Sequence, residues 1–127
     1  MTHPHKAHRG LQRIVQAAGY SFSGLGAAWR YEAAFRQECA LAVLMLPAAW
    51  WVGRNWLETA LLAGSVMGVL IVELLNSAIE AAVDRVSADL HPLSKRAKDI
   101  GSAAVMLSLI TCGSLWCAAL WQRWVSA

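Results

Sequence analysis

The sequence is poor in charged residues. Only 15% of its 127 residues are Asp, Glu, Lys or Arg, whereas soluble domains average about 25%. A chain this short has much surface for its volume and would need more polar residues to remain in water. Because 57% of the residues are hydrophobic, disordered and collagen-like chains are excluded, and lipid is the expected environment of the excess apolar surface.

Cysteine and net charge are also limited. Cys39, Cys112 and Cys117 are odd in number and lie in apolar runs, which excludes a disulfide scaffold and predicts reduced packing residues. The net charge of +3 is too small to imply nucleic acid, so no nucleic-acid partner is expected. The first ten residues are polar, which predicts that there is no signal peptide.

The usual nucleotide and metal motifs are missing as well. The sequence has no G-x-x-x-x-G-K-[ST], H-E-x-x-H or C-x-x-C pattern, and Trp29 stands where Gly24 and Gly26 would need a third glycine for G-x-G-x-x-G. A nucleotide, if the protein uses one, is therefore not held by the common phosphate-binding loops.

Three apolar segments predict an all-α integral membrane protein, with one membrane domain over residues 1–127. The predicted transmembrane helices cover about 33–53, 58–83 and 100–122. The last is about 34 Å long as a helix and spans a hydrocarbon core of about 30 Å, whereas the uncharged part of the first is only about 22 Å long. The first helix therefore needs shielding by its neighbours.

Residues 9–26 precede these spans and predict an amphipathic helix at the membrane surface. Leu11, Ile14 and Phe22 recur at helical spacing, while Arg9 and Arg13 take the other face. Three glycines are expected to interrupt this helix before a second one begins at Ala27: Gly19, Gly24 and Gly26.

The lysines and arginines predict the orientation. Nine lie before the first span or between the second and third spans, and two lie on the opposite side. Positive charge collects on the cytoplasmic side. The N-terminus and a loop over 84–99 are thus expected in the cytoplasm, and the C-terminus outside.

Polar residues inside the second span point to function. Glu73, Asn76 and Glu80 share one helix face, because their spacing of three and seven residues places them within about 60° of one another. Ionisable groups inside a membrane usually mark a functional site, although an interhelical hydrogen-bond seam would use the same residues. Lys98 and Asp99, just before the third span, suit a phosphorylated ligand and its metal.

Four strings together resemble the bacterial membrane diacylglycerol kinase family: AAGYS (17–21), EAAFRQE (32–38), VELLNSAIEAAVDR (72–85) and RAKDIGSAAV (96–105). The resemblance implies a homotrimer of three-span chains in the bacterial inner membrane, with a periplasmic C-terminus. It also implies transfer of the ATP γ-phosphate to the hydroxyl of diacylglycerol, which gives phosphatidic acid.

The resemblance also implies roles for individual residues. Glu73 would be the general base, and Mg²⁺ would be bound by Glu32 and Glu80. Apart from the resemblance, Asn76 is expected to orient Glu73, because it lies one turn away on the same face. The ATP-binding set would be Arg13, Tyr20, Glu32, Glu80, Asp89, Leu90, His91, Lys98 and Asp99. The lipid substrate would touch Arg13, Ala34, Phe35, Arg36, Gln37, Glu38, Trp51, Val52, Gly53, Arg54, Glu73 and Ser102.

Three alternatives stay open. The undecaprenol kinases share the core motif, although the EAAFRQE string and the tryptophans near the outer turn favour the diacylglycerol branch. A small proton-coupled transporter would also carry carboxylates inside the membrane, but would not need Lys98 and Asp99. A non-catalytic scaffold would use the polar face only for assembly. Lys95 departs from the small residue expected in the family.

Overall fold

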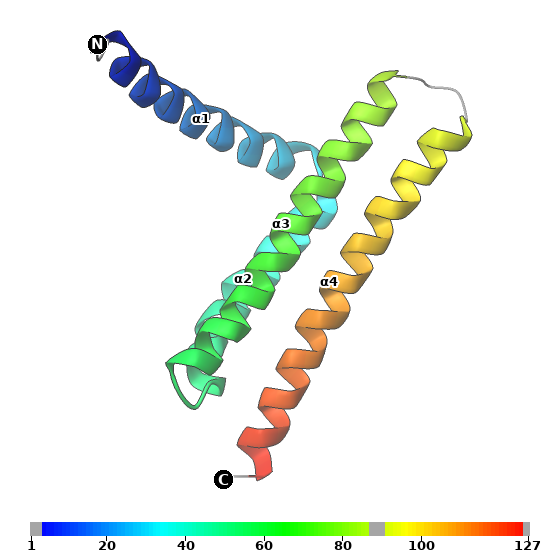
Figure 1. Cartoon of the computed structure of the whole chain (residues 1–127). Helices are drawn as coiled ribbons and strands as arrows, with labels where there is room; N and C mark the ends of the chain where they lie inside the picture. The colour runs from blue at the N-terminus through cyan, green and yellow to red at the C-terminus, as the bar shows by residue number, and fades with distance from the viewer. Residues whose placement is uncertain (1–3, 87–90, 126–127) are drawn as a thin grey trace. The chain divides into compact units, whose positions relative to one another are not determined.

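Helices make up almost all of the part of the chain that the computed structural model describes, residues 4–86 and 91–125 (Figure 1). This confirms the all-α class. In order they are α1 (Pro4–Tyr31), α2 (Ala33–Val52), α3 (Trp56–Val86) and α4 (Pro92–Val125). The chain divides into two compact units, Met1–Ala33 and Ala34–Ala127, which are described in turn.

The first unit contains α1, which is longer than expected. The prediction that glycines interrupt it is wrong, since α1 runs without a break from Pro4 to Tyr31. A glycine weakens a helix by about 1 kcal/mol but does not end it, and none of the described glycines has a positive φ. The break falls instead at Glu32, whose N–H still donates to the Ala28 carbonyl (2.9 Å).

Both the apolar and the polar side of α1 are exposed. Leu11, Ile14 and Phe22 are 64%, 68% and 75% exposed, so this apolar side is uncovered. Arg9 and Arg13 are also exposed, on the polar side. An apolar face that stays open is typical of a helix that lies in a membrane interface.

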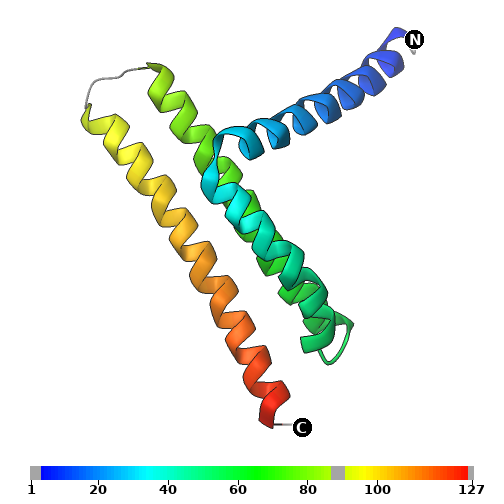
Figure 2. The ribbon, with the colours of Figure 1, turned by 180° about the vertical axis from the view of Figure 1, so that it is seen from behind.

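The second unit packs α2, α3 and α4 together. α3 and α4 run antiparallel, and α2 lies along α3 in views from both sides (Figures 1 and 2). Small residues on α2, such as Ala42 and Ala49, let the helices approach closely. The buried apolar core is formed by Ala42, Ala49, Val52, Leu62, Val66, Val69, Cys112 and Trp116.

Two of these helices, α3 and α4, are long and apolar enough to cross a membrane. In their most apolar stretches only 28% and 11% of the residues are buried within the chain, which differs from the mostly buried core helix of a soluble protein. α2 does not meet the same criterion of length and composition. It continues through Pro47 to Val52, so this proline does not end the helix.

The connection between α3 and α4 is shorter than expected. The prediction of a loop over 84–99 is wrong at both ends, because α3 extends to Val86 and α4 begins at Pro92. Proline is favoured in the first turn of a helix, and His91 caps this one: its Nδ1 accepts a hydrogen bond from the Leu93 N–H (3.1 Å).

All three cysteines are free, as expected. Cys112 belongs to the buried core and Cys39 is half-buried, but Cys117 is exposed. The prediction that all three are packed inside the chain is therefore wrong for Cys117.

Candidate functional site

The buried polar residues of the described chain gather on one stretch of α3. Glu73, Asn76 and Ser77 are only 7%, 9% and 9% exposed, and Glu80 one turn further is half-buried. Glu73, Asn76 and Glu80 thus occupy the inward side of α3, which agrees with their predicted common face. Burying a carboxyl or amide group away from water is unfavourable unless it has partners, so the contacts of each group matter.

Asn76 is held between Glu80 and α4. Its Nδ2 donates to Glu80 Oε1 over a long 3.4 Å, and its Oδ1 is buried with no hydrogen-bond partner among the described residues. Opposite this oxygen lies Gly101, where an added Cβ would overlap Asn76 Oδ1. Only glycine therefore lets α4 approach Asn76 this closely.

Lys98 links α4 to the polar end of α3. Its Nζ lies 2.7 Å from Asp84 Oδ1, with 43% and 64% of the two side chains exposed, and Glu80 also acts on it electrostatically. Glu80 and Asp84 are one turn apart and so present two carboxylates on the same side of α3. A lysine beside these carboxylates can neutralise a phosphate that reaches the same place.

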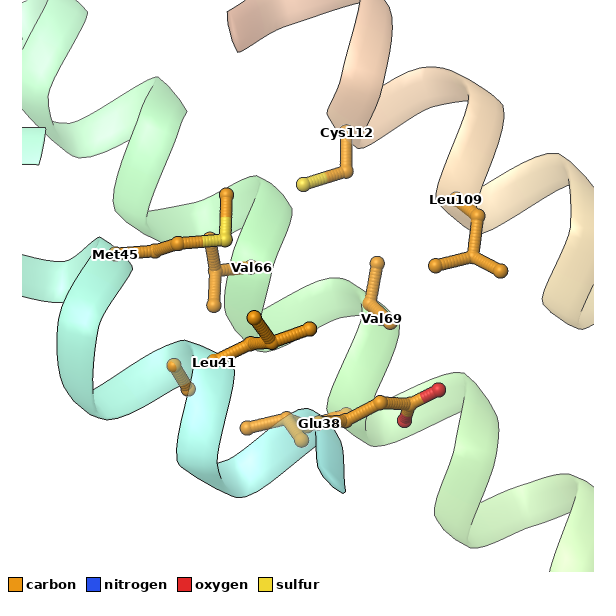
Figure 3. A pocket seen from close by; sticks show the side chains of 9 residues that line it. Glu38, Leu41, Met45, Val66, Val69, Leu109 and Cys112 are labelled. Atoms are coloured by element: carbon orange, nitrogen blue, oxygen red, sulfur yellow. The ribbon is translucent and has the colours of Figure 1, made fainter. Parts of the chain in front are cut away.

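Glu38 of α2 joins the same region. Its side chain is hydrogen-bonded to that of Glu73, which brings a residue predicted to touch lipid into contact with the predicted base. Glu38 also lines a cavity of about 70 Å³, together with apolar residues from three helices. In Figure 3 its carboxylate supplies the only oxygens in a lining that is otherwise carbon and sulfur.

Several other predicted ligands of the second unit are exposed on the surface of the described chain. Asp99 is 61% exposed and paired with Lys95 (Nζ–Oδ2 2.6 Å), and Ser102 and His91 are exposed. Lys95, which departs from the family pattern, therefore engages one of the predicted ATP-binding residues directly. Asp89 and Leu90 lie outside the described residues.

Most of the predicted lipid-binding residues lie at the two ends of α2 or just after it. Glu38 and Trp51 are thirteen residues apart, about 20 Å along a helix. Near the first end, Phe35 is buried, Arg36 is half-buried, and Ala34 and Gln37 are exposed. At the far end the Arg123 guanidinium stacks on the Trp51 ring (4.7 Å).

The turn after α2 is occupied by structural contacts. Arg54 forms an ion pair with Glu58 (2.9 Å), and Asn55 Oδ1 caps α3 by accepting from the Glu58 N–H (2.9 Å). Val52 is buried in the core, and a Cβ on Gly53 would overlap Thr59 Oγ1. These residues have local roles that do not require a lipid.

Three predicted ligands belong to the first unit. Arg13 and Tyr20 are exposed on α1, and half-buried Glu32 follows its last residue. Across the described residues, no group of three or more His, Cys, Asp or Glu could hold a metal by itself. Magnesium commonly uses one or two protein carboxylates and completes its shell with phosphate oxygens and water, so Glu80 fits as one such ligand.

Sequence reasoning missed Asp84, Gly101 and Ser77. The spacing of Glu80 and Asp84 was available as a signal, because residues four apart share a helix face. The closeness of Gly101 to Asn76 depends on how α3 and α4 pack, and no local pattern shows it. Ser77 is buried next to Asn76 but has a neutral side chain that the sequence does not distinguish from a packing residue.

The described residues define an all-helical protein whose long apolar helices carry carboxylate, amide and lysine side chains toward one end. A family model described as "Prokaryotic diacylglycerol kinase" matches residues 19–120. The diacylglycerol kinase of Escherichia coli (strain K12) is 52% identical over 114 residues, 90% of this chain and 93% of the relative. The Pseudomonas aeruginosa diacylglycerol kinase is 50% identical over 117 residues, 92% and 95% of the two chains. A Helicobacter pylori diacylglycerol kinase (strain 26695) is 42% identical over 113 residues, 89% and 88%. The chain belongs to the prokaryotic diacylglycerol kinase family.

Proposed function

We propose that this protein is a lipid kinase that transfers the γ-phosphate of ATP to the hydroxyl of 1,2-diacyl-sn-glycerol and forms phosphatidic acid in phospholipid turnover. The observation that carries this proposal is the placement of buried Glu73 and Asn76 on an apolar helix, next to Glu80 and Lys98. A lipid hydroxyl reaches such a carboxylate from the membrane, while a charged nucleotide needs the exposed lysine. The names of the relatives support the same reaction.

Glu73 acts as the general base in this proposal. It accepts the hydroxyl proton of diacylglycerol while the hydroxyl oxygen forms a bond to the γ-phosphorus and the bond from that phosphorus to ADP breaks. Asn76 lies one turn away on the same face and orients the reacting groups. Phosphoryl transfer depends mainly on positioning and on neutralising phosphate charge, which are the two tasks that these side chains can perform.

Glu80 and Glu32 are proposed to hold Mg²⁺ together with the phosphates. When bound, the ion neutralises phosphate charge and aligns the γ-phosphate. Lys98 binds a phosphate as a point charge. The remaining nucleotide contacts are assigned to Arg13, Tyr20, Asp89, Leu90, His91 and Asp99.

Lipid contacts are proposed along the length of α2. The segment 34–38 lies beside Glu73 through Glu38 and suits the reacting head of the lipid, and Trp51–Arg54 suits the distant part of its chains. Arg13, Ser102 and Glu73 complete the proposed set. The acyl chains of one lipid extend through about half of a bilayer core of about 30 Å, so they cover most of the about 20 Å between these two ends of α2.

The assembly is proposed to be a homotrimer in the bacterial inner membrane, with α2 as a third span. The N-terminus and the α3–α4 connection face the cytoplasm, and the C-terminus faces the periplasm. Gly64 and Gly68 support a partner chain: no described side chain, and no backbone outside their own helix turn, lies within 4 Å of a Cβ built at either position. Such open small-residue positions allow another helix to approach closely.

A phosphate-transfer assay in mixed micelles tests this function. Diacylglycerol and undecaprenol are offered side by side with labelled ATP and Mg²⁺, and the lipid products are separated. We expect the label in phosphatidic acid. Label in undecaprenyl phosphate alone would show that the protein is an undecaprenol kinase. If no lipid becomes labelled, the proposal of a lipid kinase is rejected.

A further inference from the structure

Two lysines near the start of α4 are each held by a carboxylate. Lys98 Nζ lies 2.7 Å from Asp84 Oδ1 of α3, and Lys95 Nζ lies 2.6 Å from Asp99 Oδ2 of α4 itself. Residues three apart on a helix are neighbours, with Cβ atoms about 5–6 Å from each other. The two ammonium groups therefore start from one short stretch of helix, where a ligand with several negative charges can engage both.

The spacing along α4 also shows which cations share a side of the helix. At about 100° per residue, Lys95 lies about 60° from Lys98 around the helix axis, and Asp99 lies about 40° from Lys95 in the other direction. Arg96, the next cation along the chain, lies about 160° from Lys98. Lys95 is thus placed beside Lys98, whereas Arg96 is nearly on the opposite side.

Lys95 can bind a ligand without giving up its ion pair. A lysine ammonium has three N–H donors, and one of them donates to Asp99, which leaves two that a ligand can engage. The Lys95 side chain is 76% exposed, compared with 43% for Lys98. A ligand from water therefore reaches Lys95 without any movement of the helices.

The ion pair also changes the charge that a phosphate would meet. A carboxylate at Asp99 without a partner would repel phosphate oxygens, because like charges disfavour each other. Contact with Lys95 neutralises this carboxylate and fixes a positive charge next to it. An ammonium held in this way can bind a phosphate as a point charge.

We infer that Lys95 is a second binding residue for the phosphates of the nucleotide, beside Lys98 and held in place by Asp99. The inference rests on the proposed function, in which Lys98 binds a phosphate of ATP. It adds a residue that the proposed function does not use, and it gives the Lys95–Asp99 pair a role in substrate binding.

Equilibrium binding of ATP with Mg²⁺, without a lipid substrate, tests this role in the assembled protein in detergent. Lys95→Gln is compared with Arg96→Gln, which removes the same charge from the neighbouring position. Losing a hydrogen bond to a charged group corresponds to about ten-fold or more, and losing an exposed ion pair to about five-fold or less. We expect Kd for ATP to rise about five- to ten-fold in Lys95→Gln and to stay within about two-fold in Arg96→Gln, as is usual for surface substitutions.

Equal Kd values for the two variants would overturn the inference, because the effect would then follow net charge and not the position of Lys95. Tighter binding of ATP by Lys95→Gln would also overturn it, and would show that Lys95 instead blocks Asp99.

AMP is the matched ligand, because it has the same base and sugar as ATP but a single phosphate. We expect Lys95→Gln to change Kd for AMP, measured by competition, by a smaller factor than Kd for ATP. An equal change for both nucleotides would mean that Lys95 shapes the site as a whole and would overturn the inference. A wild type that binds ATP but phosphorylates no diacylglycerol would instead reject the proposed function, and the binding constants would still decide the role of Lys95.

Discussion

At the Trp56 end of α3, Glu58 accepts hydrogen bonds from both the backbone and the guanidinium of Arg54 (3.0 and 2.9 Å). Toward the other end, Asn76 Oδ1 and Glu38 Oε2 are buried without a hydrogen-bond partner among the described residues, and Glu38 and Glu73 place two acids in contact. Buried polar atoms are normally satisfied. The contacts between Arg54 and Glu58 stabilise the turn before α3. The buried oxygens of Asn76 and Glu38, in contrast, stay available for a ligand or a proton.

The difference also appears in how the helices approach each other. In the turn after α2, Gly53 accommodates Thr59 of the same turn, and Trp50 packs edge-on against Trp56 (centroids 4.6 Å apart). At the other end, Gly101 accommodates the buried amide of Asn76. Close packing therefore stabilises a turn at one end of α3 and positions a buried amide at the other. Each of the following variants probes one side of this contrast.

The largest effect is expected for Glu73→Gln. The amide keeps the volume and hydrogen bonding of the side chain but accepts no proton, and general-base catalysis contributes roughly 10²–10⁴-fold. We expect kcat for lipid phosphorylation to fall at least 100-fold, with oligomeric state unchanged by size-exclusion chromatography. Retained activity in a correctly assembled variant would remove Glu73 from the role of base.

Glu32→Gln and Glu80→Gln are expected to change the metal requirement. Each removes one carboxylate from the proposed Mg²⁺ site, so the ion has to be held by fewer protein ligands. Mg²⁺ titrations of initial rate should shift to higher concentration, and ATP should bind more weakly, while partition of the lipid substrate is unaffected. An unchanged titration in both variants would assign these carboxylates to structure.

Gly101→Ala tests the close approach at Asn76. The new Cβ overlaps Asn76 Oδ1, and overpacking a tight contact typically destabilises by about 1–3 kcal/mol. We expect kcat to fall about ten-fold, because the new Cβ displaces the Asn76 side chain and catalysis depends strongly on the position of such groups. Gly113→Ala on the same helix is the matched control, since its Cβ meets no atom within 4 Å in the described chain. Equal behaviour of the two variants would show that the position of Asn76 is unimportant.

Asp84→Asn is expected to have a smaller effect. The variant removes the ion pair that holds Lys98 beside Glu80, and exposed ion pairs contribute little, about 0–1 kcal/mol. We expect KM for ATP to rise by less than about five-fold, with kcat nearly constant. A 100-fold rise in KM for ATP would show that Asp84 itself binds the nucleotide or its metal. An unchanged KM would show that Lys98 does not need the ion pair with Asp84 to bind ATP.

The smallest effect on activity is expected for Glu58→Gln. This change weakens the ion pair with Arg54 and one contact at the start of α3. Thermal unfolding should begin at a slightly lower temperature, and lipid phosphorylation should stay within about two-fold of the wild type, as is usual for surface substitutions. A loss as large as that of Glu73→Gln would contradict the difference between the two ends of α3.

The sequence alone predicted the polar face of α3, because Glu73, Asn76 and Glu80 repeat at helical spacing in an apolar segment, and burial of Glu73 and Asn76 agrees with it. It also predicted the amphipathic faces of α1. The continuity of α1 through its glycines was not predicted, because a glycine's effect on a helix depends on its neighbours. The contacts between helices could not be predicted from one sequence, because they depend on the packing of α2, α3 and α4. They are the Glu38–Glu73 hydrogen bond, the Asp84–Lys98 pair and the fit of Gly101 against Asn76.

The most direct test of the proposed phosphotransfer site asks whether neighbouring chains of the proposed homotrimer build it together, and it uses two inactive variants. Glu32→Gln and Glu73→Gln chains are unfolded, mixed and refolded, and transfer of labelled phosphate from ATP to diacylglycerol is measured across mixing ratios. If neighbouring chains supply these carboxylates to one site, as a closed homotrimer allows, some hybrids contain an intact set and activity partly returns, with a maximum at intermediate ratios. No recovery at any ratio would contradict a site shared between chains, and substantial activity of either parent alone would contradict the role given to its carboxylate.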